Sequence, residues 1–67
     1  MSDTKAANHV LATLQGEIRV EMNDRSDYMT QGAYSTLEAY REAVGEIYGL
    51  AKAESLLLAL SEKLEDD

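Results

Sequence analysis

The 67-residue sequence contains no cysteine, proline, tryptophan or phenylalanine, and it has only four glycines and one histidine. Without cysteine the chain has neither disulfides nor thiolate metal sites, and one histidine cannot form a histidine cluster around a metal. A chain of this length buries only about 60% of its unfolded surface. Disulfides, metals or oligomerisation usually support such small folds. We therefore expect the chain to associate with itself or with another protein.

Basic residues are scarce: six lysines and arginines accompany thirteen aspartates and glutamates, for a net charge of −7. Binding to nucleic-acid phosphates needs a basic patch, and anionic membranes attract basic segments. We therefore predict no direct nucleic-acid binding and no membrane binding. The first ten residues lack the apolar core of a signal peptide, and the uncharged run SLLLALS is too short to span a bilayer. We expect a soluble protein of a reducing compartment.

Patterns that carry catalysis or ligand binding are missing. His9 has no evident orienting partner, which a general base requires. The sequence has no glycine-rich phosphate loop and no EF-hand pattern. A short helical chain also offers no deep pocket of the kind that ligands use. We predict that the protein is not an enzyme and has no catalytic residues, no cofactor and no metal site.

Helix-forming residues dominate the composition and predict an all-α fold. Apolar residues at spacings of 3, 4 and 7 predict a first helix over about residues 4–31. Gly32 suits the end of that helix, and a turn is expected over about 32–35. Ser35 and Glu38 have the spacing of a capping box, which predicts a second helix over about 36–64. Residues 1–67 should thus form one domain, an antiparallel two-helix hairpin completed by oligomerisation or by docking on a partner.

The first helix carries one apolar stripe, and Arg25 falls on it four residues after Glu21, where the two can form an ion pair. With the turn centred near residue 33, residues whose numbers add up to about 66 should lie opposite each other. The stripe consists of Ala7, Val10, Leu11, Leu14, Ile18, Met22 and Met29. At 100° per residue, the side of the second helix predicted to meet it consists of Leu37, Tyr40, Val44, Ile47, Tyr48, Ala51 and Leu58.

The other side of the second helix begins acidic and becomes apolar after residue 45. A glycine inside a helix costs about 1 kcal/mol relative to alanine, but small residues one turn apart let another backbone approach closely. An exposed leucine patch usually marks an interaction site, and burying one leucine is worth about 2 kcal/mol. The predicted protein interface consists of Gly45, Gly49, Leu50, Ala53, Leu56, Leu57, Leu60 and Leu64. Alternatively, the glycines are neutral surface residues and the leucines extend the core.

The stretch from Gly32 to Leu57 resembles a group of very small proteins encoded by tailed bacteriophages. Their glycine turn is followed by a tyrosine–arginine pair, matched here by Tyr40 and Arg41, and by a V-G-x-I-x-G-L-x-x-A run. The residues that match the run are Val44, Gly45, Ile47, Gly49, Leu50 and Ala53. The resemblance implies a two-helix phage protein whose gene lies among those for the virion head and neck. Most members of the group have no assigned activity.

The prediction that follows is a non-enzymatic helical interaction protein, associated with a phage virion or its assembly. Its partner would be a second copy or a larger phage or host protein, in the virion or the host cytoplasm. A second hypothesis is an acidic phage inhibitor of a host enzyme or defence system that imitates the charge of DNA. The charge of −7 and the stripe of Glu38, Glu42 and Glu46 favour it. Arginines interspersed among the acidic residues count against it, because they interrupt any long row of negative charge.

Overall fold

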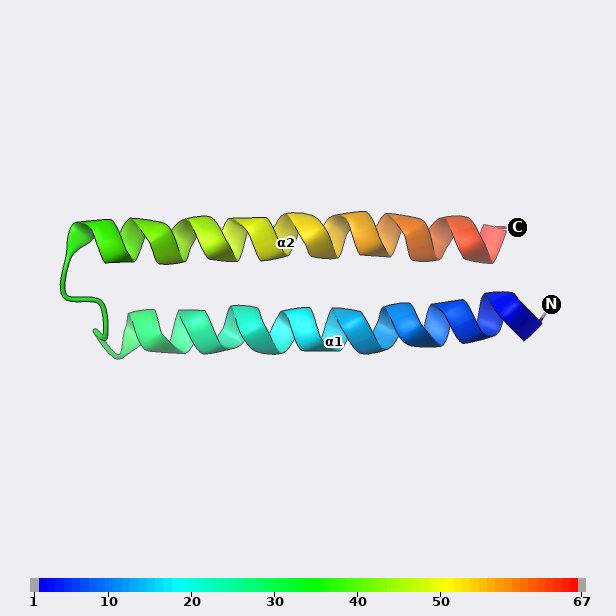
Figure 1. Ribbon diagram of the computed structural model, residues 1–67, viewed down its shortest axis with the longest axis horizontal. Helices are drawn as coiled ribbons and strands as arrows, with labels where there is room; N and C mark the ends of the chain where they lie inside the picture. The colour runs from blue at the N-terminus through cyan, green and yellow to red at the C-terminus, as the bar shows by residue number, and fades with distance from the viewer. Residues whose placement is uncertain (1, 67) are drawn as a thin grey trace.

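Two long helices lie side by side in the computed structural model and form an antiparallel hairpin (Figure 1). Helix α1 spans Ser2–Thr30 and helix α2 spans Leu37–Asp66, so the described residues are 2–66. Met1 and Asp67, which the predicted domain of residues 1–67 includes, lie outside them. The start of α1 and the end of α2 lie at the same end of a body that measures 51 × 15 × 11 Å. The predicted all-α, two-helix architecture is therefore confirmed.

Gly32 ends α1, as predicted. Its φ of +71° lies in the left-handed region that glycine enters without steric cost. The Gly32 N–H donates to the carbonyl of Met29 at 3.2 Å, and the Ala33 N–H donates to the carbonyl of Tyr28 at 3.0 Å. This pair of bonds is the Schellman arrangement, which satisfies carbonyls that the last helical turn would otherwise leave free.

The capping residue of α2 is Thr36, so the predicted capping box of Ser35 and Glu38 is wrong. The Thr36 hydroxyl accepts a hydrogen bond from the Ala39 N–H at 3.1 Å, and α2 begins at Leu37. The third helical position is then Ala39, which has no carboxylate to reach back to the cap. Serine and threonine are both good caps, so the local sequence did not decide between the two neighbours.

Three side-chain contacts between the helices define their register. Residue numbers add up to 69 for Asn8 and Ser61, to 71 for Arg25 and Glu46, and to 73 for Arg19 and Glu54. The predicted value of 66 is therefore too low by 3 to 7 residues, which is about one to two helical turns. The connection, residues 31–36, is centred at 33.5 and accounts for a sum of only 67. The rest is an offset along the axis, because α2 begins farther toward the turn end of the hairpin than the point where α1 ends (Figure 1).

The residues of α2 that face α1 recur every three or four positions, which is the average spacing of 3.5 seen in coiled coils. Among them Ala43, Glu54 and Leu57 are buried, with 3%, 7% and 8% of their surface exposed. The whole row consists of Ala43, Ile47, Leu50, Glu54, Leu57, Ser61 and Leu64.

The predicted contact side of α2 is right for Val44, Ile47 and Ala51, which are half-buried. It is wrong for Leu37, Tyr40, Tyr48 and Leu58, which are exposed. The prediction used the straight-helix period of 3.6, which drifts by about 20° per seven residues from the 3.5 period of the contact.

The cap of α2 gives a first prediction. We expect Thr36→Ala to lower the free energy of unfolding by about 1 kcal/mol, because the Ala39 N–H loses its acceptor. Urea unfolding followed by circular dichroism at a fixed protein concentration measures this. The matched control is Ser35→Ala, which we expect to change stability by less than about 0.5 kcal/mol. A larger effect at Ser35 than at Thr36 would contradict this assignment of the cap.

Candidate protein-interaction surface

The contact between the helices is polar at intervals along its length. The Ser61 hydroxyl donates to the Asn8 Oδ1 at 3.1 Å, near the chain ends. The Oε2 atom of Glu54 accepts two hydrogen bonds, one from the Nε of Arg19 at 2.7 Å and one from the Nε2 of Gln15 at 3.3 Å. Because these groups occupy positions where apolar side chains would otherwise meet, the hairpin has a thin apolar core. In the described residues no side chain is completely buried.

Glu54 is the buried charge of the hairpin. A carboxylate removed from water destabilises a fold unless it is paired and hydrogen-bonded. Here Arg19 supplies the charge and Gln15 a further donor, and among the described residues no buried side-chain polar atom lacks a partner. A slip of α2 along α1 would separate Glu54 from both. Polar groups of this kind specify the register of paired helices at some cost in stability.

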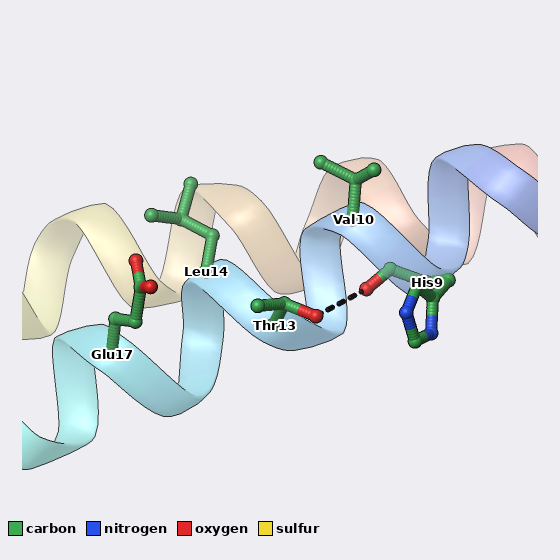
Figure 2. A pocket seen from close by; sticks show the side chains of 5 residues that line it. All are labelled: His9, Val10, Thr13, Leu14 and Glu17. Atoms are coloured by element: carbon green, nitrogen blue, oxygen red, sulfur yellow. Dashed lines mark hydrogen bonds between the residues drawn. The ribbon is translucent and has the colours of Figure 1, made fainter.

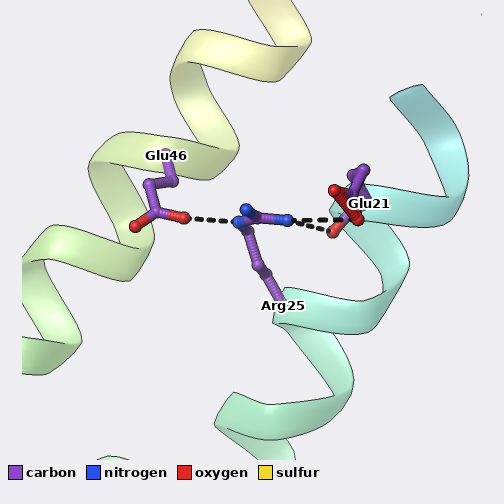
Figure 3. A network of polar contacts seen from close by, with 3 residues as sticks. All are labelled: Glu21, Arg25 and Glu46. Carbon is purple, nitrogen blue, oxygen red and sulfur yellow. Dashed lines mark hydrogen bonds and ion pairs between the residues drawn. The ribbon is translucent and has the colours of Figure 1, made fainter. Parts of the chain in front are cut away.

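Arg25 links the helices nearer the turn (Figure 3). Its Nε donates to Oε2 of Glu46 on α2 at 2.5 Å, and its Nη1 lies 3.7 Å from a carboxylate oxygen of Glu21. The predicted pair of Glu21 and Arg25 is thus confirmed. The hydrogen bond to Glu46 raises the pKa of the Arg25 guanidinium above its already high usual value. Because one side chain contacts both carboxylates, Glu21 and Glu46 mark the same flank of the hairpin.

Toward the chain ends, this flank becomes apolar. Residues seven apart in a helix lie on nearly the same side, because seven residues make almost two turns. Leu14 is seven residues before Glu21 on α1, and Leu60 is fourteen residues after Glu46 on α2. Both leucines therefore lie on the flank that Glu21 and Glu46 mark. Val10 and Leu56 each lie about one turn from these leucines. Figure 2 shows Val10 and Leu14 pointing the same way from α1. Val10 and Leu56 are 63% and 66% exposed, and Leu14 and Leu60 are 44% and 48% exposed. We call this set the apolar face: Val10, Leu14, Ala53, Leu56 and Leu60.

The predicted interface residues divide into two groups. The prediction that all eight point away from α1 is wrong for Leu50, Leu57 and Leu64. Leu57 is buried and the other two are half-buried in the contact with α1, so for these three the core alternative is correct. The remaining five residues are exposed on α2, and their role as an interface stays a prediction: Gly45, Gly49, Ala53, Leu56 and Leu60.

The sequence reasoning missed Val10 and Leu14, which it assigned to the stripe that meets α2. The available signal was the spacing of 3.5, because Leu11, Ile18 and Met22 fit that repeat whereas Val10 and Leu14 lie off it. The structure adds α1 residues to a surface that was predicted from α2 alone. The apolar face is therefore built by both helices.

A second row of exposed apolar side chains lies on the opposite side of α2 from the apolar face. It contains Leu37, Tyr48 and Leu58, with Tyr48 the most exposed at 73%. Leu58 lies roughly 200° around the helix from Leu60, on the side where Arg19 reaches Glu54. Because α1 contributes this exposed guanidinium to that side, the second row adjoins a charged group, whereas the residues that α1 contributes to the apolar face are Val10 and Leu14.

The described part of the surface has shallow, open depressions. One is lined by Asp24, Asp27, Tyr28 and Gln31. Another is lined by residues of α1 alone, His9, Val10, Thr13, Leu14 and Glu17 (Figure 2). There the Thr13 hydroxyl donates to the carbonyl of His9 at 3.0 Å, a local helix contact. Among the side chains that the structure describes, no group of three or more acidic or histidine residues gathers to hold a metal ion. Neither helix, over its described length, is long and apolar enough to cross a membrane.

No family model matches the chain, and neither a curated protein nor a solved structure matches it. The class that the fold defines is an all-α helical hairpin. What such a hairpin does is decided by its surface, and in the described residues the apolar face is the surface built by both helices with the most exposed aliphatic side chains.

The buried carboxylate gives a second prediction. We expect Arg19→Ala to lower the free energy of unfolding by about 1–2 kcal/mol, because Glu54 stays buried but loses its charged partner. Thermal and urea unfolding followed by circular dichroism measure the change. Arg41→Ala removes an exposed arginine of α2 and should change stability by less than about 0.5 kcal/mol. Equal effects of the two substitutions would show that the contact with Glu54 has no special energetic role.

Proposed function

We propose that this chain is a non-enzymatic interaction protein that packs its apolar face on helices of another protein molecule. The observation that carries the proposal is the distribution of apolar side chains. Val10, Leu14, Leu56 and Leu60 are exposed, whereas Glu54, Ser61 and Asn8 occupy the contact between the helices. Burial of aliphatic surface is the main driving force for association. A partner that covers the apolar face supplies the core that the hairpin alone does not have.

The setting we propose is a phage virion or its assembly, with the chain in the particle or in the host cytoplasm. The resemblance of residues 32–57 to small phage proteins supports this setting. Several residues on which the resemblance depends are exposed, among them Tyr40, Arg41, Gly45 and Gly49. Exposed residues of this kind are available to a partner, and the two glycines allow a close approach of another backbone.

The alternative, an acidic inhibitor that imitates DNA, has weaker support. The net charge of −7 and the exposed carboxylates of Glu38 and Glu42 favour it. Glu46, the third member of the acidic stripe, is paired with Arg25, and Arg25 also neutralises part of the charge of Glu21. Salt-sensitive capture of a host nucleic-acid enzyme would favour the inhibitor, because contacts between exposed charges weaken as salt rises.

The proposed function predicts how two matched glycine substitutions behave. A side chain added at Gly49 or at Gly16 meets nothing within 4 Å in the hairpin, so Gly49→Leu and Gly16→Leu should both fold. Gly49 adjoins Ala53 of the apolar face, whereas Gly16 lies roughly 200° around α1 from Leu14. We expect the chain to co-purify with assembled phage particles, Gly49→Leu to abolish this, and Gly16→Leu to retain it.

The measurement is immunoblotting of purified particles, with circular dichroism to establish that both variants are helical. Absence of the unmodified chain from particles would contradict the virion setting. Equal retention of the two variants would contradict a docking role for the surface around Gly49.

A further inference from the structure

We infer that the apolar face binds a second copy of the chain, and that the two hairpins lie antiparallel with their turns at opposite ends. This inference rests on the proposed function and names its partner. The face contains Val10 and Leu14 from α1 and Ala53, Leu56 and Leu60 from α2, and the two pairs of helices would form a four-helix bundle over their shared length. Area, symmetry and charge each support this arrangement.

The hairpin exposes more surface than a compact monomer of its mass, as expected for a subunit that has a partner. Its accessible surface is 5277 Å². A compact monomer of this mass has roughly 4,200 Å², so the hairpin exposes about 1,100 Å² more. A stable protein–protein interface buries about 800 Å² on each partner. Covering one side of the hairpin with another hairpin therefore removes an area of the size that a stable dimer needs.

The apolar face is also self-complementary. Residues level with each other in the hairpin have numbers that add up to between 69 and 73. The midpoint of Val10 and Leu14 is position 12, and the midpoint of Leu56 and Leu60 is position 58. Because these two positions add up to 70, the two midpoints are level with each other in the hairpin. A twofold axis that crosses both helices at this level places Val10 of one copy against Leu14 of the other. The same axis places Leu56 against Leu60, so one rotation matches both pairs. Such isologous contacts are the commonest interface of homodimers.

Charge on the same flank decides between antiparallel and parallel hairpins. Nearer the turn, this flank carries Glu17 and Glu21 of α1 and Glu42 and Glu46 of α2. Two hairpins stacked in the same direction would place the carboxylates of α1 in one copy near those of α2 in the other, and like charges across an interface are unfavourable. In the antiparallel arrangement the apolar halves overlap and the two acidic halves lie at opposite ends of the assembly.

Light scattering over about 5–500 µM tests whether a second copy binds. We expect a dimer that becomes tighter as salt screens the net charge of −7 on each chain. Leu56→Glu should weaken the dimer about a hundredfold or more, because the dimer contains this leucine twice. The matched control is Tyr48→Glu, which lies on the other exposed row of α2 and should leave the dimer intact. Both residues are exposed, so both variants should fold, which circular dichroism at low concentration verifies.

Engineered cysteines test the orientation, because the natural chain has none. Val10→Cys chains mixed with Leu14→Cys chains in a glutathione buffer should form a mixed disulfide in excess of either homodimer. Parallel hairpins would instead bring Val10 near Leu60 of the other copy and favour the mixture of Val10→Cys with Leu60→Cys. Mass spectrometry distinguishes the products, since the two variants in each mixture differ in mass.

The outcomes separate this inference from the proposed function. A chain that stays monomeric at 500 µM, or a dimer that Tyr48→Glu dissociates as readily as Leu56→Glu, overturns binding of a second copy through the apolar face. A dimer in which the Val10–Leu60 disulfide dominates overturns the antiparallel orientation. In each case, co-purification with phage particles that Gly49→Leu abolishes would still support docking on a larger protein, and its absence would count against the proposed function.

Discussion

The pairing of the Glu54 carboxylate with Arg19 and Gln15 is the contact on which the rest of the structure depends. A carboxylate with 7% of its residue surface exposed is tolerated only while its partners are in place. A shift of α2 by one turn would leave the charge buried without them. The pairing therefore fixes the register, and the register decides which residues of α2 enter the contact with α1.

A register defined by polar groups has a consequence for the apolar residues. Because Asn8, Gln15, Glu54 and Ser61 occupy the contact, fewer apolar side chains fit between the helices, and Val10 and Leu56 remain in water. The polar contacts thus specify the register of the two helices, and the hairpin has fewer apolar side chains in its core as a result. The apolar residues left outside form a face that both helices share, which ties the internal pairing of the hairpin to its capacity for association.

Local features of the sequence were sufficient to predict the architecture. Helix-forming composition, the glycine at position 32 and the Glu21–Arg25 spacing led to two antiparallel helices, the helix end and the ion pair, all of which are present. These features act within one or two helical turns, where chemistry and spacing are nearly independent of the rest of the chain. The candidate surface was predicted in part: Gly49, Ala53, Leu56 and Leu60 are exposed as expected, whereas the contribution of Val10 and Leu14 was missed.

The sequence by itself determined that there are two helices, where the first one ends and that α2 is apolar on more than one side. Only the tertiary structure decided which side meets α1. The run from Leu56 to Leu60 places leucines at 56, 57, 58 and 60, which together point around most of the helix, so hydrophobicity does not select among them. Leu57 is buried because it lies one turn from Glu54 and from Ser61, both of which bond to α1. The choice was made by contacts between residues 35 to 53 positions apart in the sequence, and periodicity within one helix contains no information about them.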